Sequence, residues 1–428
     1  MLVYVVKKGD SIWAIGEKYG VDYNQIINMN GLTNGNDITI GEALLIPTHS
    51  FSYTIKNGDT IWSIANKFKI STDVLIKFNN ITNVNGIRKG MVIKIPDNLI
   101  GYDKIEVNGF IIPSTPDKDV NIMQESIDYL TYITPFSHHV NSDGSLSPLN
   151  DYDILSYAKA HNTSTMLSVT NMSQNGFDTE LIRSILNNSY TQQNLINNII
   201  YAINEKGMQG VIVDFERIPP EDREKYNNFL RNLVKALHLQ NYLLATALAP
   251  KTSGFQQGPW YEAHDYKAQG QIVDFTILMT YEWGWSGGPP RAVSPINEVA
   301  KVLDYAVSVI PANKIMMGIP NYGYDWTLPY VEGGQFAEAM GNLEAAERAV
   351  KYGAEIKYDY SAQSPYYTYI DANQKQHVVW FEDARSIIAK FRLVQEYNLR
   401  GVSYWALGKP FPQNWVLIYT MFNVKKLV

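Results

Sequence analysis

Residues 210–216 read GVIVDFE, an apolar stretch that ends in two carboxylates. Side chains two positions apart on a β-strand point to the same side, so Asp214 and Glu216 share one side of the chain. Val213 and Phe215 then point to the opposite side, where helices can cover them. The pattern predicts a buried strand whose last inward-facing residues are acidic.

The spacing of the two carboxylates leaves their role open. Pro219-Pro220 prevents the strand from continuing, which puts Glu216 at its end. Neighbouring carboxylates tend to share a proton, and a carboxyl that stays protonated near neutral pH is able to act as a general acid. The alternative is a solvated strand end at which Glu216 pairs with Arg217 or Arg223.

Strand-like apolar runs recur along the chain and alternate with helical segments. The eight runs are EVNGFIIPS, YLTYITPF, TSTMLSVTN, QGVIVDFE, YLLATALAPK, VDFTILMTY, KIMMGIPNYG and RGVSYWALG. This alternation predicts an α/β fold, a (β/α)8 TIM barrel, in which the C-terminal rim of the strands builds the active site. A doubly wound open sheet is the alternative, but no GxGxxG motif follows the first run.

The first 98 residues contain two copies of one small module. Gly9-Asp10 and Trp13 recur as Gly58-Asp59 and Trp62, a constant spacing of 49 residues. Each copy reads as strand, helix, helix, strand, with a Gly-Asp-Ser or Gly-Asp-Thr cap before its first helix. The expected domains are a βααβ module at 1–48, a second at 51–98, and a barrel at 103–428 with a hairpin inserted near 355–384.

Composition narrows the classes of function. A chain of 428 residues exceeds the usual size of one core, and its 45% hydrophobic content is ordinary for a globular protein. A net charge of -6 argues against nucleic acid as a partner. The absence of cysteine excludes disulfides and thiol nucleophiles, and the histidines show no metal-ligand spacing, so we expect neither metal nor cofactor. No apolar run is long enough to predict a membrane span.

Both modules resemble LysM domains through the opening YxVxxGDTxWxIAxxF and the ending GxxLxIP. The resemblance implies binding of glycans that contain N-acetylglucosamine, peptidoglycan or chitin, in a shallow groove between two loops. By position, the groove residues are Gly9, Asp10, Ser11, Ile12, Asn30, Gly31 and Leu32 in the first copy and Gly58, Asp59, Thr60, Ile61, Asn79, Asn80 and Ile81 in the second. The alternative is that the Gly-Asp-Ser/Thr sequences only cap a helix.

The larger domain resembles family 18 glycoside hydrolases. GVIVDFE is similar to the family's DGxDxDxE signature, LMTYEWG at 278–284 to its MxYD motif, and GIPNYGYDW and GVSYWALG to its seventh and eighth strands. The chain departs from these family motifs at three positions. Gln209 and Ile212 replace the first and second Asp, so the inner carboxylate that usually partners the retained Asp is missing, and Glu282 replaces the Asp of the sixth-strand motif.

The resemblance implies a mechanism in which the substrate's own acetamido oxygen is the nucleophile. Glu216 is then the acid and base, Asp214 and Tyr281 hold the acetamide, and Trp405 forms the floor under the sugar at the cleavage point. Further contacts at the rim are expected from Glu282, Trp283, Trp285, Tyr322 and Tyr324.

Two LysM domains before a family 18 barrel resemble spore cortex-lytic N-acetylglucosaminidases. This implies cleavage of peptidoglycan after N-acetylglucosamine during germination, in the cortex or coat region of the spore. We also expect a monomer. The N-terminal apolar run carries its charges after it, which is the wrong order for a signal peptide. Two alternatives remain open: a chitinase, and a glycan-binding spore-coat protein without activity, which the loss of the carboxylate at Ile212 favours.

Overall fold

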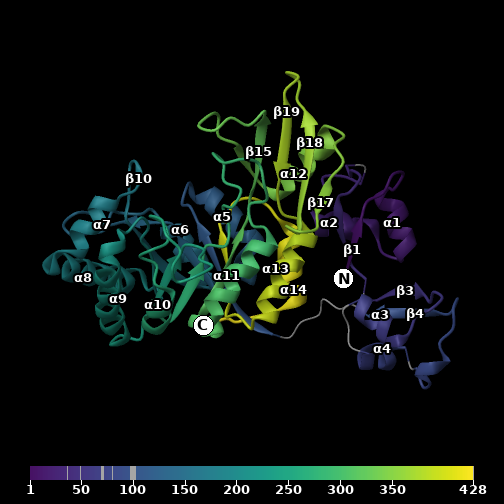
Figure 1. Cartoon of the computed structure of the whole chain (residues 1–428), viewed down its shortest axis with the longest axis horizontal. Helices are drawn as coiled ribbons and strands as arrows, with labels where there is room; N and C mark the ends of the chain where they lie inside the picture. The colour runs from purple at the N-terminus through teal and green to yellow at the C-terminus, as the bar shows by residue number, and fades with distance from the viewer. Residues whose placement is uncertain (36, 49, 69–71, 80, 97–102, 428) are drawn as a thin grey trace.

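The structure is a computed structural model that describes residues 1–35, 37–48, 50–68, 72–79, 81–96 and 103–427. Eight parallel strands form a closed barrel at its centre (Figure 1). They are β5 (Lys104–Ile111), β6 (Tyr132–Pro135), β8 (Ser164–Thr170), β11 (Gly210–Asp214), β12 (Leu243–Leu248), β13 (Phe275–Leu278), β14 (Ile315–Pro320) and β20 (Gly401–Trp405). Each pairs with the next in this order, and β20 pairs with β5. The predicted TIM barrel is confirmed, with all eight strands in the predicted runs.

Helices surround the barrel and connect its strands. They are α5 (Pro116–Ser126), α6 (Tyr152–Ala160), α7 (Thr179–Leu186), α8 (Ser189–Lys206), α9 (Arg223–His238), α10 (Tyr266–Ile272), α11 (Ile296–Val309), α13 (Ala384–Glu396) and α14 (Pro412–Met421). Short strands β7 (His138–His139) and β21 (Asn423–Val424) pair with β8 and β5. Strands β9 (Met172–Ser173) and β10 (Gly176–Phe177) form a small hairpin. Within the described ranges, no helix combines the length and apolar character that a membrane crossing requires.

The two faces of β11 have different surroundings, as its period of two predicts. Val211, Val213 and Phe215 pack outward in the apolar cluster that α7, α8 and α9 cover. Ile212 points into the barrel and packs in the interior cluster with Phe110, Tyr132, Met166, Ala245, Phe275, Ile277 and Met316. Since Asp214 follows Ile212 by two residues, it lies on the same inner side at the C-terminal end of the strand.

A five-stranded antiparallel sheet projects from the barrel at the top of Figure 1. Its order is β16-β15-β19-β18-β17, from β15 (Gly323–Leu328), β16 (Glu338–Met340), β17 (Lys357–Asp359), β18 (Ser364–Ile370) and β19 (Gln376–Trp380). Helix α12 (Asn342–Lys351) lies between β16 and β17 in the chain. The range 355–384, expected to hold a hairpin, contains the paired strands β18 and β19 together with β17.

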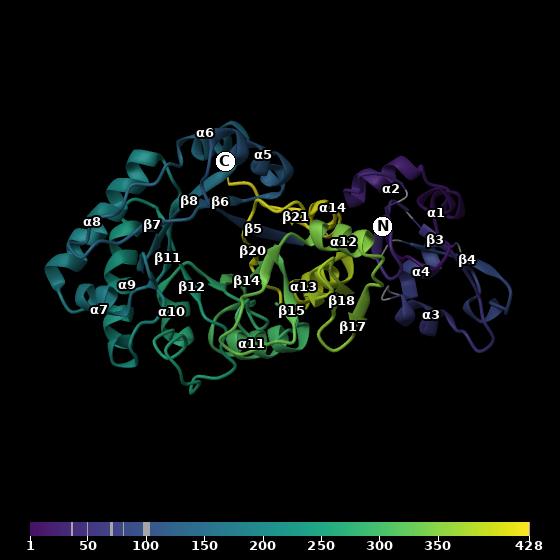
Figure 2. The same ribbon diagram turned by 90° about the horizontal axis from the view of Figure 1, so that it is seen from above.

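The N-terminal repeats both have the order strand, helix, helix, strand. The first contains β1 (Leu2–Val5), α1 (Ile12–Tyr19), α2 (Tyr23–Asn30) and β2 (Ala43–Ile46). The second contains β3 (Ser50–Thr54), α3 (Ile61–Lys67), α4 (Thr72–Phe78), a 3-10 turn and β4 (Val92–Pro96). Figure 2 shows both repeats on the side of the barrel where α12 lies. In each repeat the two strands pair antiparallel, so the predicted βααβ modules are confirmed.

Candidate active site

Asp214 lies at the end of β11, inside the barrel wall and almost out of contact with solvent. Its side chain is 6% exposed, and its Oδ1 atom has no hydrogen-bond partner among the described residues. Burial penalises the charged form, which raises the pKa of Asp214 to about 7. Ile212 below it pairs in register with Ser168 of β8, and Asp214 itself with Thr170. The position that holds an inner carboxylate in the family signature is therefore occupied by a buried hydrocarbon.

Glu216 follows the strand and is half-buried. Burial raises its pKa well above the usual range, and the negative charge of Asp214 raises it further, while Arg217 partly opposes this. Within the described part of the chain, no ion pair joins Glu216 to Arg217 or Arg223; the Arg217 guanidinium instead stacks 4.5 Å from the centre of the Trp260 ring. Glu216 therefore lies in the electrostatic field of Asp214 and is not a solvated strand end.

Asn171, just after β8, holds the backbone of Glu216 from both sides. Its Oδ1 accepts from the Glu216 N–H at 2.9 Å, and its Nδ2 donates to the Glu216 carbonyl at 2.9 Å and to the Asp178 carbonyl at 3.1 Å. Asn171 is completely buried, so these bonds are shielded from water. No motif in the sequence identified Asn171; its signal is its place at the end of a barrel strand.

His264 fixes the neighbouring peptide. Its Nδ1 accepts from the Ala249 N–H at 2.8 Å, so Nε2 carries the proton and donates to the Phe215 carbonyl at 3.0 Å. Burial lowers the pKa of His264 to about 4, which keeps the ring neutral and this arrangement intact near pH 7. His264 lies in a loop far along the chain, and no sequence pattern identified it.

Tyr281 and Glu282 follow β13 and extend the site. Burial raises the pKa of Tyr281, and the charges of Asp214, Glu216 and Glu282 raise it further, which places this hydroxyl in the field of all three carboxyls. Glu282 is exposed overall and has a left-handed backbone, with φ of 68°. Its carboxylate accepts hydrogen bonds from the hydroxyls of Tyr322 and, at 3.0 Å, Tyr324.

The predicted aromatic contacts have different surroundings. Trp405, at the end of β20, is half-buried and packs against Phe136, with ring centres 4.6 Å apart. Tyr322 and Tyr324 are buried in the cluster that Tyr281 and Trp405 also contact. Two other predicted residues stand apart: Trp283 packs against the outer apolar core, and Trp285 is 47% exposed beside Phe336. The structure therefore joins Asp214, Glu216, Tyr281, Glu282, Tyr322, Tyr324 and Trp405 at one end of the barrel.

This arrangement offers an acid and an electrostatic partner at the end of the barrel. Burial raises the pKa of both carboxyls, which favours a protonated carboxyl near neutral pH, and the Tyr281 phenol lies in the electrostatic field of both. Across the residues that the structure describes, no three histidine, aspartate or glutamate side chains gather as metal ligands would. The chemistry that the site offers is acid–base catalysis by side chains.

Sequence comparison assigns both parts of the chain. Residues 99–409 match glycosyl hydrolases family 18, and residues 4–47 and 53–96 each match the LysM domain. The chain belongs to glycosyl hydrolase family 18. It is a glycoside hydrolase with two LysM domains.

Relatives extend over the full length of this family 18 chain. The cortical fragment-lytic enzyme of Bacillus subtilis is 50% identical over 100% of this chain and 99% of its own length. The crystal structure of the Bacillus megaterium spore cortex-lytic enzyme SleL has a TM-score of 0.88 at 43% identity, covering 100% of this chain and 99% of that one. A Chromobacterium violaceum chitinase shares the fold, with a TM-score of 0.68 at 24% identity over 74% of this chain and 98% of its own.

The predicted glycan-binding residues of the LysM domains also hold the modules together. Asp10 accepts hydrogen bonds from the Tyr4 hydroxyl and the Lys7 N–H, both at 2.7 Å, and Asp59 accepts the equivalent pair from Tyr53 and Lys56. Ser11 and Thr60 cap the helices α1 and α3, and the two isoleucines that follow them, Ile12 and Ile61, are buried.

The residues of the second loop of each predicted groove also have structural roles. The side chains of Asn30 and Asn79 each make three hydrogen bonds within their own module, to a helix carbonyl and to both backbone groups of the last strand. Gly31 takes a left-handed conformation that ends α2. Leu32 and Ile81 pack on the core of their module, Gly9 and Gly58 leave open space beside the first loop, and Asn80 lies outside the described residues.

Proposed function

We propose that this family 18 enzyme hydrolyses spore cortex peptidoglycan, at the β-1,4 bond that follows N-acetylglucosamine. The observation that carries the proposal is the pair of a buried Asp214 and a half-buried Glu216 at the mouth of the barrel, with one oxygen of Asp214 unpartnered among the described residues and both pKa values raised. A buried acceptor of this kind suits the N–H group of an acetamide. A protonated Glu216 suits the glycosidic oxygen.

In the proposed reaction the acetamido oxygen of the substrate attacks the anomeric carbon, and Glu216 gives its proton to the leaving oxygen. Asp214 and the Tyr281 hydroxyl hold the acetamide, and Asp214 stabilises the positive charge that develops on the cyclic intermediate. Water then opens this intermediate with Glu216 as the base, so the anomeric configuration is retained. Trp405 supplies an apolar face for the distorted sugar.

The choice of substrate rests on the relatives and on the domain order. Full-length relatives are named for lysis of cortical fragments and of spore cortex. LysM domains suit a polymeric glycan, because linked weak sites raise the effective affinity for it. We therefore propose the spore cortex as the place of action and N-acetylglucosamine as the sugar on the non-reducing side of the cut.

The proposal is tested with purified cortex fragments and mass spectrometry of the products. The wild type should produce new reducing ends on N-acetylglucosamine, whereas Glu216→Gln should produce none above background. Glu221→Gln is the matched control, since Glu221 is exposed and its ion pair is with Arg183. Faster cleavage of chitin oligomers than of cortex fragments would replace the proposed substrate with chitin. Reducing ends on muramic acid would refute the proposed bond.

A further inference from the structure

The first LysM domain shares a hydrophobic core with the barrel. Leu45 on β2 is fully buried in the cluster that contains the apolar residues of α13 and α14, and Val3 and Met29 pack against the same cluster. Helix α2 lies against α14, and β2 lies against α13. A face buried in this way stabilises both partners, because apolar surface is removed from water on each.

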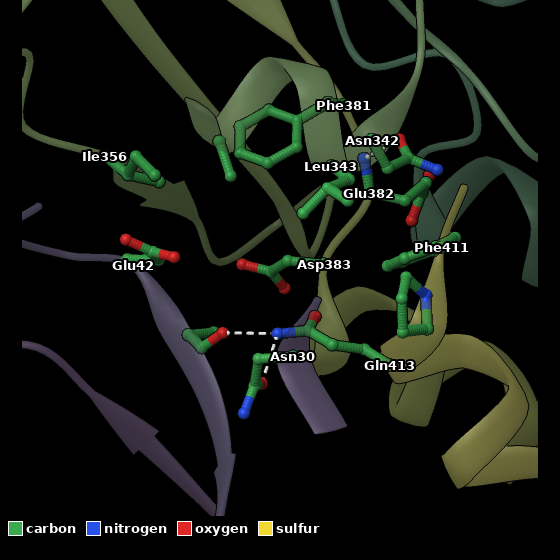
Figure 3. A pocket seen from close by; sticks show the side chains of 13 residues that line it. Asn30, Glu42, Asn342, Leu343, Ile356, Phe381, Glu382, Asp383, Phe411 and Gln413 are labelled. Carbon is green, nitrogen blue, oxygen red and sulfur yellow. Dashed lines mark hydrogen bonds between the residues drawn. The ribbon is translucent and has the colours of Figure 1, made fainter. Parts of the chain in front are cut away.

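Hydrogen bonds line this contact along its length. Gln413 on α14 donates from Nε2 to Asn30 Oδ1 and to the Ala43 carbonyl, both at 2.8 Å (Figure 3). Arg385 on α13 donates to the Gly41 carbonyl at 3.1 Å, and Thr39 Oγ1 donates to the Ala354 carbonyl at 2.8 Å. Backbone pairing adds a bond from the Ile356 N–H to the Ile40 carbonyl at 2.9 Å. The module and the barrel therefore meet through matched donors and acceptors as well as through apolar packing.

The contact occupies one wall of the predicted glycan groove. A Cβ atom placed on Gly31 would lie 2.8 Å from Cγ of Pro412 and 3.3 Å from Cδ2 of Leu343. Barrel side chains thus fill the space directly beside Gly31, in the second loop of this predicted groove. The internal hydrogen bonds of Asn30 are unchanged from those of Asn79, and the bond from Gln413 is added to them.

The second LysM domain has a different surface at the same positions. Counting 49 residues on, Leu45 becomes Lys94 and Val3 becomes Ser52, and both replacements are exposed. Met29 becomes Phe78, which is 46% exposed, and every hydrogen bond that the structure describes for residues 50–96 stays within the module. The second module therefore has the same fold without the apolar face through which the first module contacts the barrel.

We infer that the two LysM domains have different roles. The first is a fixed part of the catalytic unit, and capture of the polymeric glycan falls to the second, whose described residues make no hydrogen bond to the barrel. The inference rests on the proposed function in one respect, that LysM domains of this chain bind cortex glycan. It identifies Trp62, 67% exposed directly after the first groove loop, as an aromatic surface for a sugar ring of this glycan.

The docking half is tested with Leu45→Lys and Lys94→Leu in the full chain. We expect Leu45→Lys to lower the temperature at which activity on soluble fragments is lost by roughly 5 °C or more, since it puts a charge into the shared core. Lys94→Leu should leave that temperature unchanged. Equal effects of the two substitutions would overturn the docking.

If Leu45→Lys does not fold, hydrogen exchange on the unaltered protein tests the contact between the first LysM domain and the barrel instead. Amides of β2 should exchange at least about tenfold more slowly than those of β4, because opening β2 also requires opening its contact with the barrel. The same exchange rate in both strands would overturn the inference. Neither measurement depends on glycan binding by the LysM domains.

The capture half is tested by pelleting the full chain with insoluble purified peptidoglycan. Trp13 is the matched control for Trp62, because it occupies the same position in the docked module and is 62% exposed. Trp62→Ala should lower the bound fraction several-fold, and Trp13→Ala should not. Equal losses of the bound fraction in the two variants would refute the different roles of the two domains. A wild type that does not pellet would refute glycan capture, and with it this part of the proposed function, while the exchange result would still report on docking.

Discussion

Replacing Asn171 with Ala tests how Glu216 is held without touching either carboxylate. The substitution removes two hydrogen bonds to the Glu216 backbone and one to the Asp178 carbonyl. At about 1 kcal/mol each, the lost bonds amount to about 3 kcal/mol of unfolding free energy. A shift of the carboxylate by about 1 Å costs on the order of 100-fold in rate, so kcat should fall by about that factor. KM should change little, because Tyr281 and Trp405 are not touched.

The choice of substrate separates a positioning role from general damage. An acid is needed most for a poor leaving group such as a sugar hydroxyl, and least for a nitrophenolate, which departs without a proton. Asn171→Ala should therefore lose about 100-fold in kcat on cortex fragments but only a few-fold on a nitrophenyl N-acetylglucosaminide.

A nearby serine provides the control for this substitution. Ser173→Ala, which removes a hydrogen bond to Gly176 in the same loop, should leave both rates unchanged. Equal losses on the two substrates for Asn171→Ala would refute the positioning role. An unchanged kcat on cortex fragments would do the same.

Three further substitutions test the coupling of the two carboxyls, the stacking role of Trp405 and the presence of Ile212 in place of the signature's inner Asp. Asp214→Asn removes a charge that raises the pKa of Glu216, so Glu216 should lose its proton at lower pH. The alkaline limb of the residual pH–rate profile should then move to lower pH, and an unmoved limb would contradict the coupling between the two carboxyls. Trp405→Ala should lower kcat/KM about tenfold by loss of stacking worth about 1.5 kcal/mol, and steady-state kinetics on cortex fragments would contradict this if kcat/KM did not change. Ile212→Asp should lower the unfolding free energy at pH 7 by on the order of 3 kcal/mol, because the site is surrounded by hydrocarbon; a denaturant titration that shows a gain in stability would refute this.

The barrel was predictable because parallel strands covered on both faces are continuous apolar runs with polar ends. The same period of two predicted that Asp214 and Glu216 share a side. The outer sheet was harder to predict. Strand β15 pairs with β19, which lies about fifty residues further along the chain, and local sequence patterns carry no information on such pairing.

The residues that position the site were not predictable from local sequence. Asn171 and His264 act on the backbone of residues 215–216 through bonds across more than forty residues, and a side chain that binds a distant carbonyl leaves no motif. The docking of the first LysM domain did leave a signal. Leu45 and Lys94 occupy the same position in the two repeats, and this difference in polarity was visible once the repeats were aligned.

In the proposed mechanism, Glu216 is the acid of a reaction in which the substrate's acetamide is the nucleophile. The most direct measurement compares substrates with and without the N-acetyl group, at equal concentration and with the same leaving group. We predict that the wild type cleaves the N-acetylated substrate and releases a product of retained configuration, and that the deacetylated substrate is not cleaved. Cleavage of both at similar rates, or a product of inverted configuration, would contradict the account.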